Sequence, residues 1–109
     1  MLQQKPLPIH DEKELQRQLE VFLTENGFAF NREYRLSNKD IPDFFIEGVI
    51  IEVKIKGNKR AIFDQCIRYL NYPEVNTLIL LTSVPIGNFS SLIPPGKDLH
   101  IINSNSAWL

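Results

Sequence analysis

The stretch that decides the fold is "IPDFFIEGVIIEVKIKG", residues 41–57. Almost every residue in it favours a buried strand, yet it carries Asp43, Glu52 and Lys54. Burying a charge costs free energy unless the charge is paired or bound to an ion. Three charges within the most strand-like segment of the chain therefore need a physical explanation.

Glu47 and Gly48 stand at the centre of this stretch and predict a two-residue turn between two antiparallel strands. Side chains along a strand alternate between faces, so one face of the hairpin is wholly apolar. The other face gathers the charged residues at the open end of the hairpin. The predicted pairs are Ile46 with Val49, Phe45 with Ile50, Phe44 with Ile51, and Asp43 with Glu52.

Like charges directly opposite each other in a hairpin are destabilising, so the pair of Asp43 and Glu52 breaks a local rule. Such breaks are expected at functional sites. Two carboxylates at this separation can share a hard divalent cation, and Lys54 points to the same side and can reach an anion. This combination suits phosphodiester hydrolysis. The alternative is a surface salt bridge between Lys54 and one carboxylate on a solvent-facing side of the sheet.

Apolar periodicity and turn residues predict the elements around the hairpin. The almost wholly apolar run 76–83 is typical of a strand covered on both faces, paired in parallel with the strand before the second helix. We expect one α/β domain over residues 1–109, with the element order α-β-β-β-α-β in a core at 11–83 and a loop, edge strand and tail at 84–109. The predicted elements are a helix at 11–26, a strand at 28–36, the hairpin at 41–57, a helix at 59–71, a strand at 76–83, a loop at 84–98 and an edge strand at 99–102.

The composition is that of an ordinary globular protein, with a formal net charge of −1, so nucleic-acid binding would need a local basic patch. The single cysteine, Cys66, excludes an internal disulfide and fits a reducing, cytoplasmic location. No apolar run approaches the length of a membrane span.

At the hairpin the chain resembles the PD-(D/E)XK nuclease superfamily, which has the restriction-endonuclease-like fold. The resemblance rests on Pro42 and Asp43, eight intervening residues and then Glu52, Val53 and Lys54, together with the order of elements over 11–83. A glutamine on the following helix, Gln65, also matches. In size the chain is similar to Holliday-junction resolvases, RecB-like modules and virus-type repair nucleases.

The resemblance implies a metal-dependent DNA endonuclease that uses Mg²⁺, with Mn²⁺ as a substitute. Branched DNA, or DNA in repair or recombination, is one candidate substrate, and the sequence does not specify which DNA structure is cut. Asp43, Glu52 and the backbone carbonyl of Val53 would hold the metal. Lys54 would orient the attacking water and stabilise the phosphate charge. Gln65 would belong to the same site, although a boundary position on its helix is the alternative.

Other residues have more open assignments. Glu12 either ends the apolar stripe of the first helix at solvent or points into the site, and Glu33 is either a supporting group or an exposed residue. A basic run beside the hairpin is either a solvated face or the patch that DNA binding requires. The predicted DNA-binding residues are Lys56, Lys59, Arg60 and Tyr69.

Two other classes of function compete with the endonuclease. One is an idle nuclease fold that serves as a DNA-binding or assembly subunit, and the other is a structural α/β domain without affinity for cations. DNA is the predicted partner, and apolar residues within 84–109, including Trp108, predict a homodimer.

Overall fold

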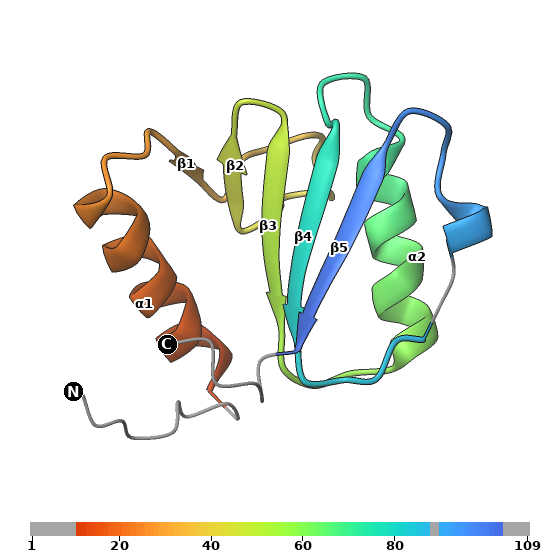
Figure 1. The fold of residues 1–109 in the computed structure, drawn as a ribbon, viewed down its shortest axis with the longest axis horizontal. Helices are drawn as coiled ribbons and strands as arrows, with labels where there is room; N and C mark the ends of the chain where they lie inside the picture. The colour runs from red at the N-terminus through yellow and green to blue at the C-terminus, as the bar shows by residue number, and fades with distance from the viewer. Residues whose placement is uncertain (1–10, 88–89, 104–109) are drawn as a thin grey trace.

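The computed structural model describes residues 11–87 and 90–103. A five-stranded mixed sheet lies between two helices, α1 (Glu12–Glu25) and α2 (Lys59–Leu70), and the strands follow one another across the sheet in chain order (Figure 1). This arrangement confirms the predicted α/β class. The strands are β1 (Asn31–Arg32), β2 (Phe44–Ile46), β3 (Val49–Lys54), β4 (Thr77–Thr82) and β5 (Asp98–Asn103).

The hairpin of β2 and β3 has the predicted register. Phe44 pairs with Ile51, and Ile46 pairs with Val49 across the turn. Both turn residues have positive φ, 44° at Glu47 and 89° at Gly48. These angles match the right-handed twist of the flanking strands, which is why such two-residue turns close hairpins.

Helix α2 connects β3 to β4, and these two strands pair in parallel, as the sequence predicts. The helix begins at Lys59 because Asn58 caps it: the Asn58 side chain accepts a hydrogen bond from the N–H of Ala61 at 3.0 Å. β4 has buried residues facing both sides, among them Leu80 and Leu81. The parallel crossover therefore places one end of α2 directly after the charged end of β3.

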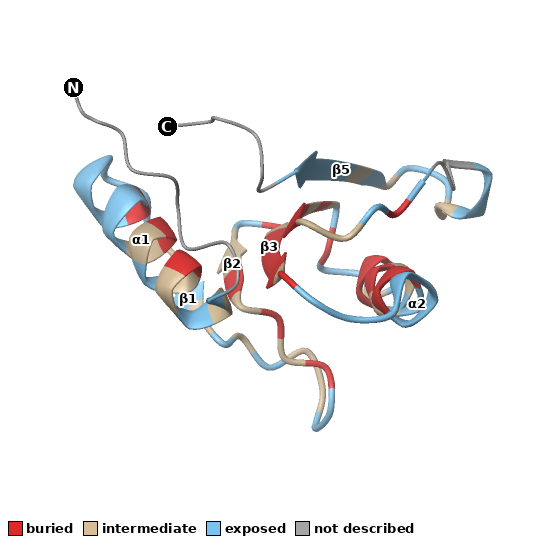
Figure 2. Cartoon of the chain, turned by 90° about the horizontal axis from the view of Figure 1, so that it is seen from below, coloured by how far each residue is buried: buried red, intermediate tan, exposed pale blue. Residues whose placement is uncertain are grey.

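Each face of the sheet has its own apolar core, and the two helices cover opposite faces (Figure 2). The wholly apolar face of the hairpin packs on α1, where Phe44 and Val53 are fully buried. The other face, which carries Ile50, packs on α2. The charged residues of β3 therefore lie on the α2 side of the sheet, because they share the alternation of Ile50.

The predicted strand at 28–36 is much shorter in the structure, where β1 spans only Asn31–Arg32. Glu33 has φ of 51°, which turns the backbone out of the sheet. Its N–H donates to the carbonyl of Asp43 at 2.8 Å, and Tyr34 stacks on Phe45 with ring centroids 4.2 Å apart. The aromatic residues that suggest a strand thus pack against the hairpin from a loop.

The C-terminal part contains the predicted edge strand, which is β5 and pairs in parallel with β4. The preceding loop includes a short 3-10 helix, η1 (Ser90–Leu92). Ile86, one of the apolar residues predicted to form an interface, is instead buried in the core on the α2 side. Trp108 lies outside the described residues.

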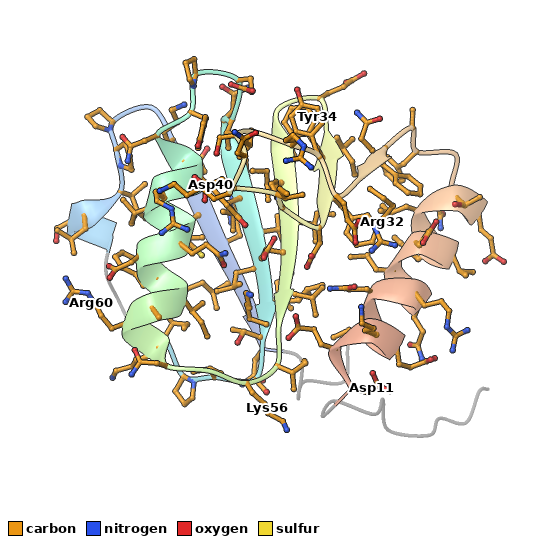
Figure 3. The ribbon with its side chains drawn as sticks, turned by 180° about the vertical axis from the view of Figure 1, so that it is seen from behind. Asp11, Arg32, Tyr34, Asp40, Lys56 and Arg60 are labelled. Atoms are coloured by element: carbon orange, nitrogen blue, oxygen red, sulfur yellow. The ribbon has the colours of Figure 1, made fainter. Side chains whose placement is uncertain are left out.

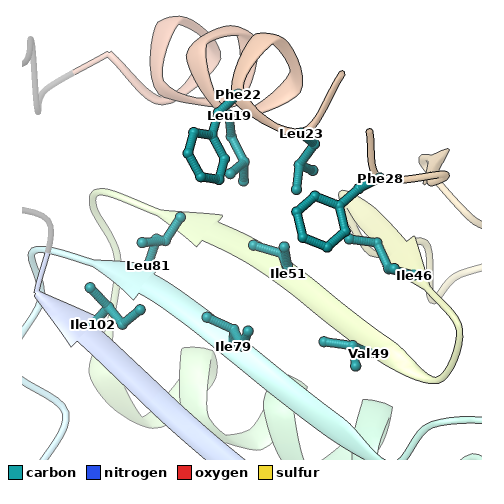
Figure 4. A pocket seen from close by; sticks show the side chains of 10 residues that line it. All are labelled: Leu19, Phe22, Leu23, Phe28, Ile46, Val49, Ile51, Ile79, Leu81 and Ile102. Atoms are coloured by element: carbon teal, nitrogen blue, oxygen red, sulfur yellow. The ribbon is translucent and has the colours of Figure 1, made fainter. Parts of the chain in front are cut away.

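Helix α1 covers only part of its face of the sheet. Beside it an open apolar groove of about 700 Å³ runs from the helix across the neighbouring strands (Figure 4). Phe22, Phe28 and Ile102 line this groove and are exposed. Within the described residues, no helix is both long enough and apolar enough to cross a membrane.

Candidate active site

The hairpin brings Asp43 and Glu52 together at its open end. Asp43 directly precedes β2, and Glu52 lies in β3. The N–H of Asp43 donates to Oε1 of Glu52 at 3.0 Å, and the N–H of Val53 donates to Oδ2 of Asp43 at 2.9 Å. Each carboxylate is therefore held by the backbone of the opposite segment, and each keeps a second oxygen that these two bonds do not use.

Burial makes this acidic pair electrostatically unfavourable in the absence of a cation. Glu52 is only 4% exposed, so its ion pair with Lys54 is partly buried and is not the surface salt bridge of the alternative interpretation. Desolvation, followed by the charge of Asp43, raises the pKa of Glu52 to about 8. Desolvation also raises the pKa of Asp43, against the hydrogen bond from Val53. The metal-free pair therefore binds a proton more readily than two isolated carboxylates would.

Glu12 joins this pair from the first turn of α1. Its Oε1 accepts a hydrogen bond from the N–H of Ile55 at 3.1 Å, and its charge contributes to the raised pKa values of Asp43 and Glu52. The side chain of Glu12 thus turns toward the site rather than ending the apolar stripe at solvent. Glu33, the other open candidate, is exposed.

The edge of β3 beyond the end of β2 has unpaired backbone groups that two carboxylates satisfy. Alternate N–H groups of a strand point to the same side, so those of Val53 and Ile55 point past β2 to Asp43 and Glu12 respectively. The carbonyl of Val53 points to this same side, because the N–H and C=O of one strand residue share a direction. It therefore faces the acidic cluster.

Lys54 supplies a positive charge next to the acidic pair. Its Nζ lies 3.9 Å from Oε2 of Glu52, and its charge opposes the rise in the pKa of both Asp43 and Glu52. The side chain is partly exposed, so it can also reach a ligand in solvent.

Gln65 lies across from Lys54 on α2. Both line a cavity of about 410 Å³ between the end of β3 and the helix, which Lys56 and Arg68 also line. The structure therefore places Gln65 and Lys54 on the same cavity.

The predicted DNA-binding residues divide into two groups. Lys56, Lys59 and Arg60 are exposed near the start of α2, and Arg60 also pairs with Asp64 at 3.0 Å. Figure 3 shows Lys56 and Arg60. Tyr69 is a correction, because only 2% of it is exposed and it packs in the core on the α2 side. A side chain at that depth cannot stack on or contact DNA.

Asp40 is a structural residue that no local sequence pattern indicates. It is 3% exposed, and its Oδ1 accepts hydrogen bonds from Nε and Nη2 of Arg68 at 3.1 and 3.0 Å. The hydroxyl of Tyr72 donates to its Oδ2 at 2.8 Å. Arg68 therefore pairs with the loop before β2 rather than with its own helix. Partners 28 and 32 residues away leave no local pattern in the sequence.

The donors at the hairpin fit a magnesium ion. Within residues 11–87 and 90–103, no three His, Cys, Asp or Glu side chains are grouped so as to hold a metal by themselves. Mg²⁺ does not need three, because it is held by one or two carboxylates and keeps several waters. The free oxygens of Asp43 and Glu52 and the carbonyl of Val53 form a hard oxygen donor set of this kind.

No protein-family model matches the chain, and no curated protein matches it significantly. One solved structure, a CdiA-CT/CdiI toxin and immunity complex from Burkholderia pseudomallei, is 18% identical over 94% of this chain and 88% of that chain, with a TM-score of 0.40. A TM-score of this size does not establish a shared fold.

Proposed function

We propose that the protein is a metal-dependent DNA endonuclease of the PD-(D/E)XK type. The observation that carries the proposal is the buried Glu52, hydrogen-bonded to the N–H of Asp43 and 3.9 Å from Lys54. A buried acidic pair reduces stability unless it is protonated or neutralised by a cation. A divalent ion would neutralise the two carboxylates and would also supply the Lewis acid that phosphodiester hydrolysis needs.

Asp43, Glu52 and the carbonyl of Val53 would hold Mg²⁺, or Mn²⁺ in its place. When bound, such an ion polarises a phosphoryl oxygen and lowers the pKa of a coordinated water. Lys54 places its ammonium group beside Glu52, where it can stabilise the negative charge of a scissile phosphate. Gln65 can bind and orient the same phosphate or its water from the α2 side. Glu12 fixes the edge of β3 through Ile55 and adds negative charge that strengthens cation binding.

An idle nuclease fold that only binds DNA is the second candidate. The exposed Lys56, Lys59 and Arg60 would serve that function equally well. Burial of Glu52 beside Asp43 favours the enzyme, because a binding module gains nothing from two desolvated carboxylates and loses stability by keeping them.

The direct test is incubation of the protein with labelled duplex, single-stranded, flap and four-way-junction DNA in Mg²⁺, in Mn²⁺ and in EDTA. A Glu52→Gln variant purified in parallel controls for contaminating nucleases. We expect cleavage that requires the metal and disappears in the variant. Metal-independent binding without cleavage of any of the four substrates would instead identify the idle module.

A second copy of the chain is the protein partner that we propose. Cutting both strands of a duplex needs two sites, and a twofold dimer supplies them. Strand β5 lies at the edge of the sheet, with Ile101 and Ile102 exposed on opposite faces. An exposed apolar edge strand can pair with the same strand of another copy.

A further inference from the structure

The cavity beside Lys54 is also lined by Lys56 and Arg68, which have no role in the proposed metal chemistry. Of the described side chains that line it, Lys54, Lys56 and Arg68 are cationic, and none is acidic. The cavity lies between the end of β3 and the side of α2, so its cations come from two separate elements. A ligand that fits here would be an anion.

Arg68 is held in place for such a ligand. Two of its nitrogens, Nε and Nη2, donate to the buried carboxylate of Asp40, which Tyr72 also fixes from the far side. Desolvation acts to raise the pKa of Asp40, but the bonds from Arg68 and Tyr72 and the charge of Arg68 outweigh it, so the pKa is lowered and the carboxylate stays ionised. The Arg68 side chain remains 52% exposed, so its other donors stay accessible. An arginine fixed in this way loses little entropy when it binds an oxyanion.

Lys56 gives the cavity a charge that no protein group neutralises among the described residues. Lys54 is near Glu52 and Arg68 is paired with Asp40, whereas Lys56 has no ion pair within the part of the chain described. Figure 3 shows Lys56 at the connection between β3 and α2. The side chains of Lys54 and Lys56 fall on the same side of the chain by strand alternation.

We infer that Lys56 and Arg68 form a second phosphate-binding site, which holds the backbone phosphate next to the one that is cut. Lys54 lies between the two positions and contacts both cavity and acidic pair. That the bound phosphate belongs to a nucleic acid rests on the proposed function; that the cavity binds phosphate does not. A fixed backbone phosphate on one side of the scissile bond aligns the strand for attack.

The test separates the two claims by using inorganic phosphate first and a short thymidine oligonucleotide second, both without divalent metal. Binding is followed by NMR shifts of the backbone amides. Lys56→Gln and Arg68→Lys remove one donor group each, and Arg68→Lys keeps a positive partner for Asp40. Arg35→Gln is the control, because Arg35 is exposed and its neighbour Tyr34 lies at the opposite end of the sheet from Lys56 (Figure 3).

We expect phosphate to shift the amides around Gly57 and Gln65, with about tenfold weaker binding in Lys56→Gln and no change in Arg35→Gln. In a cleavage assay Lys56→Gln should raise KM and also lower kcat, because the strand is then less well aligned for attack. Absence of phosphate binding, or equal weakening in the Arg35→Gln control, would overturn the inference. Phosphate binding in a protein that never cuts DNA would leave this site standing and remove the proposed enzyme.

Discussion

The N–H of Asp43 donates a hydrogen bond to the carboxylate of Glu52 at 3.0 Å, and the N–H of Val53 donates one to the carboxylate of Asp43 at 2.9 Å. These reciprocal charge-assisted bonds offset part of the repulsion between the two acidic side chains. They also orient both carboxylates toward the open end of the hairpin. A substitution here therefore tests charge cleanly only if it preserves a hydrogen-bond acceptor.

The isosteric variants Asp43→Asn and Glu52→Gln should lower cleavage by at least about 100-fold while keeping the fold, because the amide oxygen still accepts the backbone hydrogen bond. Asp43→Ala should instead lose about 1–3 kcal/mol of stability, since the N–H of Val53 is left without its acceptor. Turnover of labelled DNA and thermal unfolding measure the two effects. Near-wild-type cleavage by either isosteric variant would contradict the proposed metal site.

Metal-free stability should fall as pH rises from about 4.5 to about 8. The pKa of Glu52 is raised from its ordinary 4.5 to about 8 by desolvation and then by Asp43, so in this window the native state binds more protons than the unfolded state. The contribution of protonated Glu52 to stability is fully present below pH 4.5, and it is lost as the pH rises through about 8. Mg²⁺ should restore stability, most strongly at the alkaline end.

Chemical denaturation between pH 5 and 9, in EDTA and in Mg²⁺, measures this dependence. Glu52→Gln should flatten the metal-free slope, whereas Glu47→Gln, which changes an exposed turn residue, should leave it unchanged. If the free energy of unfolding of Glu52→Gln changes with pH as steeply as that of the wild type, groups other than Glu52 cause the pH dependence.

Lys54→Ala should reduce turnover by about 100-fold or more and DNA affinity by only a few fold, because one phosphate contact is a small part of binding. Its loss also removes a charge that favours ionised Glu52, so the acidic limb of the pH–rate profile should move to higher pH. Single-turnover rates and equilibrium binding in Ca²⁺ separate the two quantities. Equal losses in turnover and affinity would argue against a catalytic role for this lysine.

A substitution in the hairpin turn should increase the stability of the protein. Glu47 has φ of 44°, a region that costs a residue with an ordinary side chain about 1 kcal/mol and that asparagine tolerates. Glu47→Asn should therefore raise the free energy of unfolding by about 0.5–1 kcal/mol. Gly48→Ala should do the reverse, because the φ of 89° at this position is strained for a residue with a side chain, and the new Cβ would also displace the Asn76 side chain. Thermal melts of both variants check the pair of expectations.

The proposed dimer should depend on β5. Ile101 is 41% exposed on this edge strand, and a charge there disfavours strand pairing between copies. Ile101→Lys should convert a dimer at micromolar concentration to a monomer in sedimentation velocity. Val21→Lys is the matched control, because Val21 is similarly exposed but lies on α1. A wild-type monomer, even with DNA added, would end the proposal, as would a dimer that survives Ile101→Lys.

The amino-acid sequence by itself determines the local geometry on which the candidate site is built. The period-2 pattern around Glu47 and Gly48 specifies the hairpin and its register, so the proximity of Asp43 and Glu52 follows from neighbours along the chain. The 3.6-residue pattern and the caps likewise predict both helices to within one or two residues. These features depend on interactions over a few residues, which a sequence displays directly.

Only the tertiary structure decides which side chains from distant segments meet. Glu12 reaches the N–H of Ile55 across 43 residues, and Asp40 fixes Arg68 across 28. Burial of Tyr69 is set in the same way, by how α2 rests on the sheet. Helical spacing places Tyr69 at the edge of an apolar stripe. How deeply a side chain at that edge is buried depends on the packing of the whole helix face against the sheet, and no local pattern encodes this packing.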